Sequence, residues 1–462
     1  MDWIRERWRG DGGMRQLLDV AFPLIMSTGS YSVMMFVDRM FLSWHSEEAI
    51  AASVPASILS FSFLCFFMGL VMYSSTFVAQ YFGAGRRDRI GTVIWQGLRL
   101  AVLGGVTLPL LNLVAPSIFA LVGHDPEVQV LEVAYFRILS FVALFTLTNS
   151  AFSCFFSGRG KTWPVMWMSV SMCTLNGFLD YALVLGNWGM PRLGIRGAGI
   201  ATLISAATAA LIYAFLVLRP ANDLIFATRR HWRFESVLFL RMVRFGAPSG
   251  LQFWLSISGF AVFVLLIGRI GKLELITSNM AQQVNMLGIL PMVGIGIATS
   301  ILVGRFQGAG RSGLAVRATQ SAVSLSLAYS FGMAVLYLVI PRLLLAPFTA
   351  GQAGIATPAV LGLAVGLLRF MAVALVIDSL TIVLGGTLKG AGDTRFVMVT
   401  NAITSVFCLV LPTFLVIEVF HLSIYAAFMV MIINLAVIAS IFVIRFRGGR
   451  WKAIRVIEEG EG

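Results

Sequence analysis

Long apolar segments recur along the whole chain, and they constrain its fold more than any other feature. Twelve of them can be placed between charged or Gly- and Pro-rich connections: 20–42, 50–78, 93–115, 133–156, 164–185, 196–218, 243–270, 275–303, 318–345, 359–387, 397–419 and 423–444. About 20 mostly apolar residues are enough for a helix to cross a bilayer. The pattern therefore predicts twelve transmembrane helices, of which 50–78 and 275–303 are long enough to tilt or kink.

Composition excludes the other broad classes. Of 462 residues, 58% are hydrophobic and 12% are charged, whereas about a quarter of a soluble domain is charged. A soluble globular protein and a disordered chain are therefore both excluded. The four cysteines lie inside apolar segments and are expected to be free thiols, and the four histidines lack metal-ligand spacing. No cofactor is expected.

The basic residues orient the chain in the membrane. If both termini are cytoplasmic, 25 of the 34 Lys and Arg residues lie in cytoplasmic connections or tails and five lie on the opposite side. Such an excess predicts a multi-pass protein of the cytoplasmic (inner) membrane with both termini in the cytoplasm. It also explains the net charge of +13 through contact with anionic membrane lipids, so no nucleic-acid partner is expected.

The two halves of the chain resemble each other at an offset of 225 residues. Pro23 corresponds to Pro248, and the loop GAGR at 83–86 recurs at 308–311. Later in the chain the offset becomes 232, where Gly158, Gly160 and Thr162 match Gly390, Gly392 and Thr394. Each half holds six spans, so both halves start on the same side and the repeat is parallel. We expect an N-lobe at 1–218, a cytoplasmic linker at 219–242 and a C-lobe at 243–462. Duplicated halves of this kind are typical of secondary transporters that bind substrate between them.

Acidic residues inside the spans are the strongest functional signal. Asp38, Asp180 and Asp378 lie within apolar segments, where a carboxylate costs about 2.5–3.5 kcal/mol on insertion scales. Their counterparts in the other half are Phe263, Pro412 and Thr146. The charges therefore break the symmetry of the scaffold, as functional sites would. For each acid, a salt bridge or a structural hydrogen bond is the alternative.

Depth in the membrane brings four polar residues together. Counting ~1.5 Å per residue, Asp38 and Asp180 lie in the outer halves of spans 1 and 5, and Thr202 lies at a similar depth in span 6. Asn176 precedes Asp180 by four residues and shares its helix face. These oxygen ligands suit a hard cation such as Na+. Two close carboxylates would equally hold a proton, so the sequence leaves Na+ and H+ both open.

The sequence contains no complete motif for nucleotide binding or for catalysis. GRGKT at 158–162 ends like a nucleotide-binding loop, but Phe155 stands where that loop needs a glycine. No catalytic constellation occurs in the sequence, so an enzyme is not expected. A channel would not need a duplicated scaffold with asymmetric acids.

Several motifs resemble those of the multidrug and toxic compound extrusion (MATE) family. Span 1 reads PLIMSTGSYSVMMFVDRMFLSW, and the loops VAQYFGAGRRD and VGRFQGAGR follow spans 2 and 8. FFSGRGKTWP and LGGTLKGAGDTR resemble the loops after spans 4 and 10, and NGFLDY with GIRGAGIATLIS resembles spans 5 and 6. The resemblance covers nearly the whole chain. It is nearest to the bacterial and archaeal branch of the DNA-damage-inducible type.

The resemblance implies an all-α integral membrane protein with twelve helices in two pseudo-symmetric six-helix lobes that form a V. It implies a monomer that exports small amphipathic or cationic, drug-like compounds in exchange for Na+ or H+ by alternating access. The residues that match the family's N-lobe cation site are Asp38, Asn176, Asp180, Thr202 and, less closely, Asn149. Pro23 matches the proline at which the first helix bends.

The C-lobe departs from the family pattern. Asp378 matches an acid of the sodium-driven branch, but Ser256 stands where that branch has a glutamate, with Gln252 one turn earlier. This departure favours coupling through the N-lobe. The alternative function is a flippase for a lipid-linked precursor, which would need a cationic cavity. Besides Arg39, only Arg99, Arg137 and Arg369 lie within spans.

Overall fold

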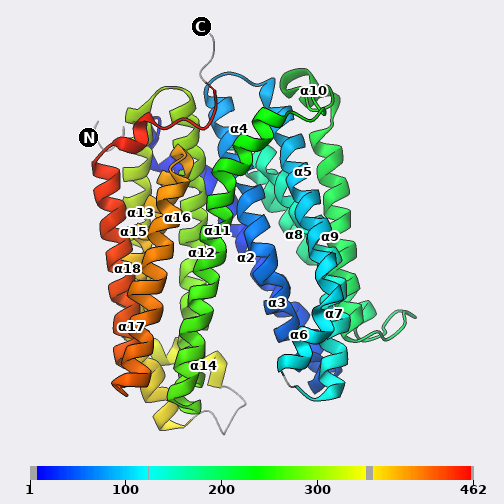
Figure 1. The fold of residues 1–462 in the computed structure, drawn as a ribbon, viewed down its shortest axis with the longest axis vertical. Helices are drawn as coiled ribbons and strands as arrows, with labels where there is room; N and C mark the ends of the chain where they lie inside the picture. Colours follow the sequence, from blue (N-terminus) through cyan, green and yellow to red (C-terminus); the bar gives the residue numbers. More distant parts are fainter. Residues whose placement is uncertain (1–7, 123, 350–356, 459–462) are drawn as a thin grey trace. The chain divides into compact units, whose positions relative to one another are not determined.

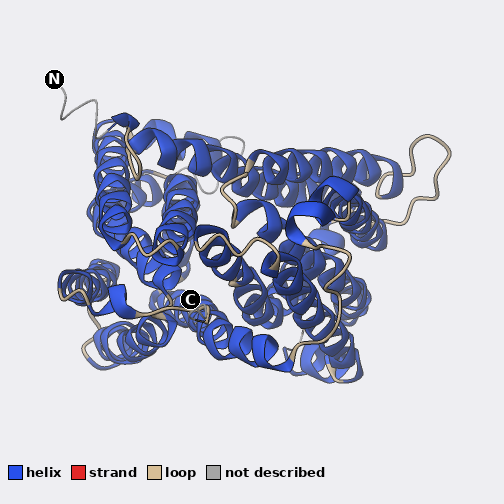
Figure 2. Ribbon diagram, turned by 90° about the horizontal axis from the view of Figure 1, so that it is seen from above, coloured by secondary structure: helices blue, strands red, loops and turns tan. Residues whose placement is uncertain are grey.

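The computed structural model describes residues 8–122, 124–349 and 357–458. In these ranges every regular element is a helix, as Figure 2 shows. Among the described residues, eleven helical segments are long and apolar enough to cross a membrane. The segment expected at 164–185 is the helix α8 (Trp163–Leu183), which is not among the eleven because Asn176 and Asp180 lower its mean hydropathy. With α8 the described ranges hold twelve spans, and the all-α membrane fold is confirmed.

The helices divide into two compact units. The N unit comprises Met26–Trp254 and Val456–Gly462, and the C unit comprises Met1–Ile25 and Leu255–Arg455. The divisions fall inside α2 (Met14–His45) and α11 (Ser236–Ile270), shortly after Pro23 and Pro248. Each unit therefore includes the opening segment of the other half's first span. The two prolines that correspond in the repeat mark these divisions.

The N unit is built around a long central helix, α7. The helices that lie wholly in this unit are α3 (Glu47–Met72), α4 (Ser74–Gly83), α5 (Arg89–Leu110), α6 (Ala115–Val122), α7 (Pro126–Ser157), α8, α9 (Ile195–Val217) and α10 (Pro220–Phe226), with a 3₁₀ turn at Leu111–Leu113. Helix α7 packs against α3, α5 and α9, and α9 packs against α8 (Figure 1). The predicted span 50–78 is interrupted at Tyr73, between α3 and α4.

The C unit has α15 at its centre. Its helices are α12 (Lys272–Gly308), α13 (Ser312–Val339), α14 (Pro341–Thr349), α15 (Pro358–Ala391), α16 (Thr394–Thr404), α17 (Leu411–Phe414) and α18 (Ile424–Arg447). Helix α15 packs against α12, α13 and α18. The eleventh span continues from α16 through two π-helical stretches, Ser405–Val410 and Leu415–Val419. Buried apolar side chains such as Phe263, Met371 and Phe428 form the core of the C unit.

Two glycines that correspond in the repeat make equivalent close contacts. In the N unit, a Cβ on Gly69 would lie 2.7 Å from the Cα of Gly250. In the C unit, a Cβ on Gly294 would lie 2.4 Å from Cγ1 of Ile25. At an offset of 225 residues, Gly69 corresponds to Gly294 and Ile25 corresponds to Gly250. The two contacts are therefore equivalent in the repeat. The structure thus supports the duplication at the level of helix packing.

Candidate cation site

Small residues hold α9 tightly against its neighbours in the N unit. A Cβ on Gly197 would lie 2.5 Å from the carbonyl oxygen of Leu183 at the end of α8. A Cβ on Gly199 would lie 2.9 Å from Cγ2 of Ile138 in α7. Any side chain at these two positions would push the helices apart. The motif GIRGAGIA therefore fixes the position of Thr202, one turn further along α9.

The part of α2 that belongs to the N unit lies beside α8. The hydroxyl groups of Ser27 and Ser169 are 2.6 Å apart, and a Cβ on Gly177 would lie 3.5 Å from Cγ1 of Val37. Val37 adjoins Asp38, and Gly177 adjoins Asn176. The same packing that joins the helices therefore brings their polar residues together.

Four of the predicted site residues converge in the N unit. Asp38 and Thr202 are 2% and 5% exposed, and Asn176 and Asp180 are fully buried. The Asp38 carboxyl faces the Asp180 carboxyl and the Asn176 side chain closely enough to interact with both. Asn176 Nδ2 lies 3.4 Å from Thr202 Oγ1, and this hydroxyl donates to the carbonyl of Ala198 at 2.9 Å. Helices α2, α8 and α9 thus each contribute to one polar cluster.

The oxygens of the carboxylate pair are poorly satisfied in the part of the chain that the structure describes. Although Asn176 lies close by, none of the four oxygens of Asp38 and Asp180 has a hydrogen-bond partner of good geometry among the described residues. Two unit charges ~4 Å apart repel by about 4 kcal/mol at an effective dielectric constant of about 20. A proton or a small cation between the carboxylates would remove this repulsion and satisfy the oxygens. In the described part of the chain, no group of three His, Cys, Asp or Glu side chains could hold a metal ion, so a cation would also need amide and hydroxyl oxygens.

Tyr135 on α7 is a member of the cluster that sequence reasoning missed. It is 2% exposed, lies near both Asp38 and Asp180, and hydrogen-bonds Ser57. A tyrosine in an apolar span has no charge to draw attention to it. The repeat offers a signal, however, because the counterpart at the later offset of 232 residues is Leu367.

A buried acid on the same helix was also missed. Glu132 is fully buried, and its Oε1 lies 2.7 Å from Nδ1 of His124. The predicted span begins at residue 133, so Glu132 lies just outside it. Its other carboxylate oxygen has no partner within the residues that the structure describes.

Asn149 and Pro23 lie at some distance from the pair. Asn149 Nδ2 donates to the carbonyl of Ala206 at 3.0 Å, one helical turn along α9 from Thr202. The Asn149 side-chain oxygen is buried and has no partner among the described residues. Pro23 lies within a continuous α2, 15 residues before Asp38.

The C-lobe candidates are not brought together in one unit. Asp378 is half-buried on α15, and the Thr381 hydroxyl of the same helix donates to its carboxylate and to its backbone carbonyl. Ser256 lies in the C unit, whereas Gln252 lies in the N unit. Asp378 thus has a hydrogen-bond donor of good geometry on its own helix.

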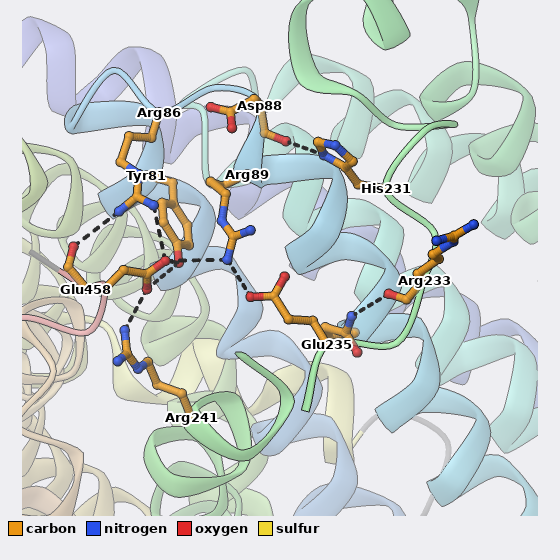
Figure 3. Close-up of polar contacts among 10 residues, drawn as sticks. Tyr81, Arg86, Asp88, Arg89, His231, Arg233, Glu235, Arg241 and Glu458 are labelled. Atoms are coloured by element: carbon orange, nitrogen blue, oxygen red, sulfur yellow. Dashed lines mark hydrogen bonds and ion pairs between the residues drawn. The ribbon is translucent and has the colours of Figure 1, made fainter. Parts of the chain in front are cut away.

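A second polar cluster in the N unit surrounds Glu458 near the C-terminus (Figure 3). Its carboxylate accepts from Arg241 at 2.6 Å, Tyr81 Oη at 2.8 Å, Arg86 at 3.2 Å and Arg89 at 3.4 Å. Burial would raise the pKa of Glu458, but hydrogen bonds, including that from Tyr81, and the charges of Arg241 and Arg86 lower it below its usual value. This cluster fixes the tail and does not involve Asp38 or Asp180.

Known proteins resemble the chain over most of its length. The MatE family model matches residues 23–182 and 248–415. A protein of Bradyrhizobium diazoefficiens named "Probable multidrug resistance protein NorM" is 29% identical over 443 residues, 94% of this chain and 92% of the relative. NorM of Geobacillus kaustophilus is 30% identical over 69% of this chain and 70% of the relative.

Solved structures share the fold. An outward-facing MATE family multidrug resistance transporter of the MOP superfamily superposes with a TM-score of 0.87 at 19% identity, covering 98% of both chains. A MOP superfamily transporter from Pyrococcus furiosus superposes at 0.86 and 20% identity, covering 97% of this chain and 98% of the other. The expected family is confirmed, while the assignment to one branch stays a prediction. The chain belongs to the MatE family and is a multi-pass membrane transporter, not an enzyme.

Proposed function

We propose that the chain exports small amphipathic or cationic, drug-like compounds in exchange for Na+ or H+, and that Asp38 and Asp180 form the coupling site. The single observation that carries this proposal is the buried pair of carboxyl groups whose oxygens have no hydrogen-bond partner of good geometry among the described residues. The relatives named as multidrug resistance proteins support the substrate class.

The pair provides a reason for exchange. When both carboxylates are charged, their repulsion of about 4 kcal/mol favours uptake of a cation. A cation bound between them draws Asp38 on α2 towards Asp180 on α8. Asn176 and Thr202 add neutral oxygens, which suit Na+, and a shared proton would serve the same purpose.

Helix α2 is the element through which the site acts on the rest of the protein. Pro23 removes one backbone hydrogen bond from this helix, so bending there is cheap. Movement of Asp38 on cation binding bends α2 near Pro23 and reduces the space for substrate in the N-lobe. Cation uptake and substrate release are thereby linked. Alternating access follows if substrate and cation favour different states.

The orientation is proposed from the charge distribution. Both termini and the basic connections face the cytoplasm, and the protein lies in the inner membrane. Asp38 and Asp180 then lie towards the external side, from which the coupling cation arrives. A flippase for a lipid-linked precursor is not favoured, because the relatives reported above are named as multidrug resistance proteins.

The test is transport in proteoliposomes with Na+ and H+ gradients imposed separately. We expect export of the lipophilic cation tetraphenylphosphonium to follow one of the two gradients and to stop when that gradient is collapsed by an ionophore. Transport that proceeds equally without either gradient would contradict an exchange mechanism.

A further inference from the structure

A cavity of about 460 Å³ lies beside the C-terminal end of α18 in the C unit. Its lining residues are Phe396, Ile441, Ile444, Arg445, Gly448 and Arg450. Ile441, Ile444 and Arg445 on α18 and Gly448, which caps its C-terminal end, are spaced i, i+3, i+4 and i+7, so they share one face of the helix. The volume is in the range of small-molecule sites. We call this cavity the α18 groove.

One end of the α18 groove is apolar and faces outward. Ile444 is 71% exposed, although it lies in a segment long and apolar enough to span a membrane. An exposed apolar side chain in such a segment is suited to contact with lipid tails. A Cβ on Gly448 would meet only carbonyl oxygens of its own helix, at 3.3 and 3.7 Å. The absence of a side chain at Gly448 therefore keeps the groove open.

The other end of the α18 groove is basic. Arg445 Nε lies 2.7 Å from Asp393 Oδ2, and its guanidinium lies 4.6 Å from the centre of the Phe396 ring. Arg450 is exposed and pairs with no carboxylate among the described residues. The groove is therefore lined by two arginines, of which only Arg445 pairs with a carboxylate among the described residues. The groove also adjoins the first turn of α16, where the helix dipole favours an anion.

The turn that carries Arg450 is fixed by the residues around it. Gly449 adopts a φ of +71°, which strongly favours glycine. Trp451 is fully buried, stacks on Phe446 at 5.4 Å, and donates from Nε1 to the Phe446 carbonyl at 2.9 Å. Arg450 is therefore held beside Gly448 before any ligand arrives.

We propose that the α18 groove binds an anionic phospholipid. Its phosphate lies between Arg445 and Arg450, and an acyl chain runs along Ile444 and Ile441 against Phe396. The combination of an exposed apolar strip and paired guanidinium groups at a span end fits both parts of such a lipid. This site is separate from the Asp38–Asp180 pair and does not depend on the proposed exchange mechanism.

The experiment uses the full chain in lipid nanodiscs with a photoreactive phosphatidylglycerol. After irradiation, labelled peptides are quantified by mass spectrometry. We expect labelling of the 441–450 segment to exceed that given by a phosphatidylcholine probe with the same acyl chains. Gly448→Leu, which fills the groove, and Arg450→Gln, which removes one charge, should each lower labelling by about five-fold. Arg447→Gln is the matched control, because Arg447 is an exposed arginine at the same helix end outside the groove.

Three results would overturn the proposal. They are equal labelling by the two probes, unchanged labelling in both groove variants, and loss of labelling when inorganic phosphate alone is added, which would assign the site to the free anion. If Gly448→Leu fails to fold, Arg450→Gln decides, since it changes only an exposed side chain.

Discussion

The substitution Asp38→Asn tests the energetic basis of the candidate cation site. The Asp38 and Asp180 side chains are almost completely buried, and their oxygens have no hydrogen-bond partners among the described residues. Repulsion of about 4 kcal/mol disfavours the doubly charged, cation-free pair by about a thousand-fold. Asparagine keeps the size of the side chain but removes this repulsion. The variant should therefore lose the need for a cation.

Thermal unfolding of the purified protein measures this loss. A cation at 100 times its dissociation constant stabilises a folded protein by about 2.7 kcal/mol. We expect wild-type protein to gain stability with Na+ at constant ionic strength, or with a fall in pH if the cation is H+. Asp38→Asn should show neither gain. Asp19→Asn is the matched control, because Asp19 is an exposed carboxylate on the same helix.

Transport should change in parallel with binding. For one-to-one exchange of a monovalent cationic dye, a ten-fold cation gradient supports at most about a ten-fold dye gradient. Asp38→Asn should support none, while Asp19→Asn should match wild type at equal abundance. Cation-dependent stability and export that survive in Asp38→Asn would refute the assignment. A larger loss in Asp378→Asn would move the coupling site to the C-lobe.

Three further predictions concern topology, packing and the tail. A cysteine replacing Glu127, which is exposed, should react with an impermeant maleimide in intact cells; reaction only after permeabilisation would reverse the proposed orientation. Gly69→Ala should lower the free energy of unfolding by about 1–3 kcal/mol, because the new Cβ would lie 2.7 Å from Gly250 Cα. Gly313→Ala is the control and should not lower it, because no atom lies within 4 Å of the position of its Cβ. Equal melting temperatures for the two variants would contradict the packing. The pKa of Glu458 is lower in the folded protein than in the unfolded chain. The Glu458 carboxylate therefore stabilises the tail fully at pH values above its unfolded-state pKa, and this stabilisation is lost as the pH falls through its folded-state pKa. The rate of amide hydrogen exchange at residues 456–458 should therefore rise in acid in the wild-type protein. In Glu458→Gln the exchange should be fast and nearly independent of this ionisation. Identical pH profiles for the two proteins would contradict the role of this carboxylate.

Much of the fold follows from the sequence because membrane spans are repetitive and long. The apolar segments located the helices, and the 225-residue offset is reflected in the paired contacts of Gly69 and Gly294. Hydropathy alone located α8 less clearly than its neighbours, because Asn176 and Asp180 make it more polar. The interruption at Tyr73 and the π-helical stretches of the eleventh span depend on local packing, which apolar periodicity does not encode.

The candidate site was predictable where a residue carries charge in an apolar span. Asp38 and Asp180 were recognisable for that reason, and helix spacing added Asn176. Tyr135 was missed because an uncharged aromatic residue is ordinary in a membrane helix. Glu458 was missed because its partners are more than 200 positions away in sequence, so no local pattern records the contact.

Simultaneous measurement of the two fluxes tests the central claim most directly. Proteoliposomes would carry indicators for Na+ and H+, and a gradient of tetraphenylphosphonium would be imposed without a cation gradient. The exchange mechanism predicts that tetraphenylphosphonium entry drives one of the two cations in the opposite direction, and that Asp180→Asn abolishes this counterflow. Tetraphenylphosphonium movement with no cation counterflow in wild type, or undiminished counterflow in Asp180→Asn, would contradict it.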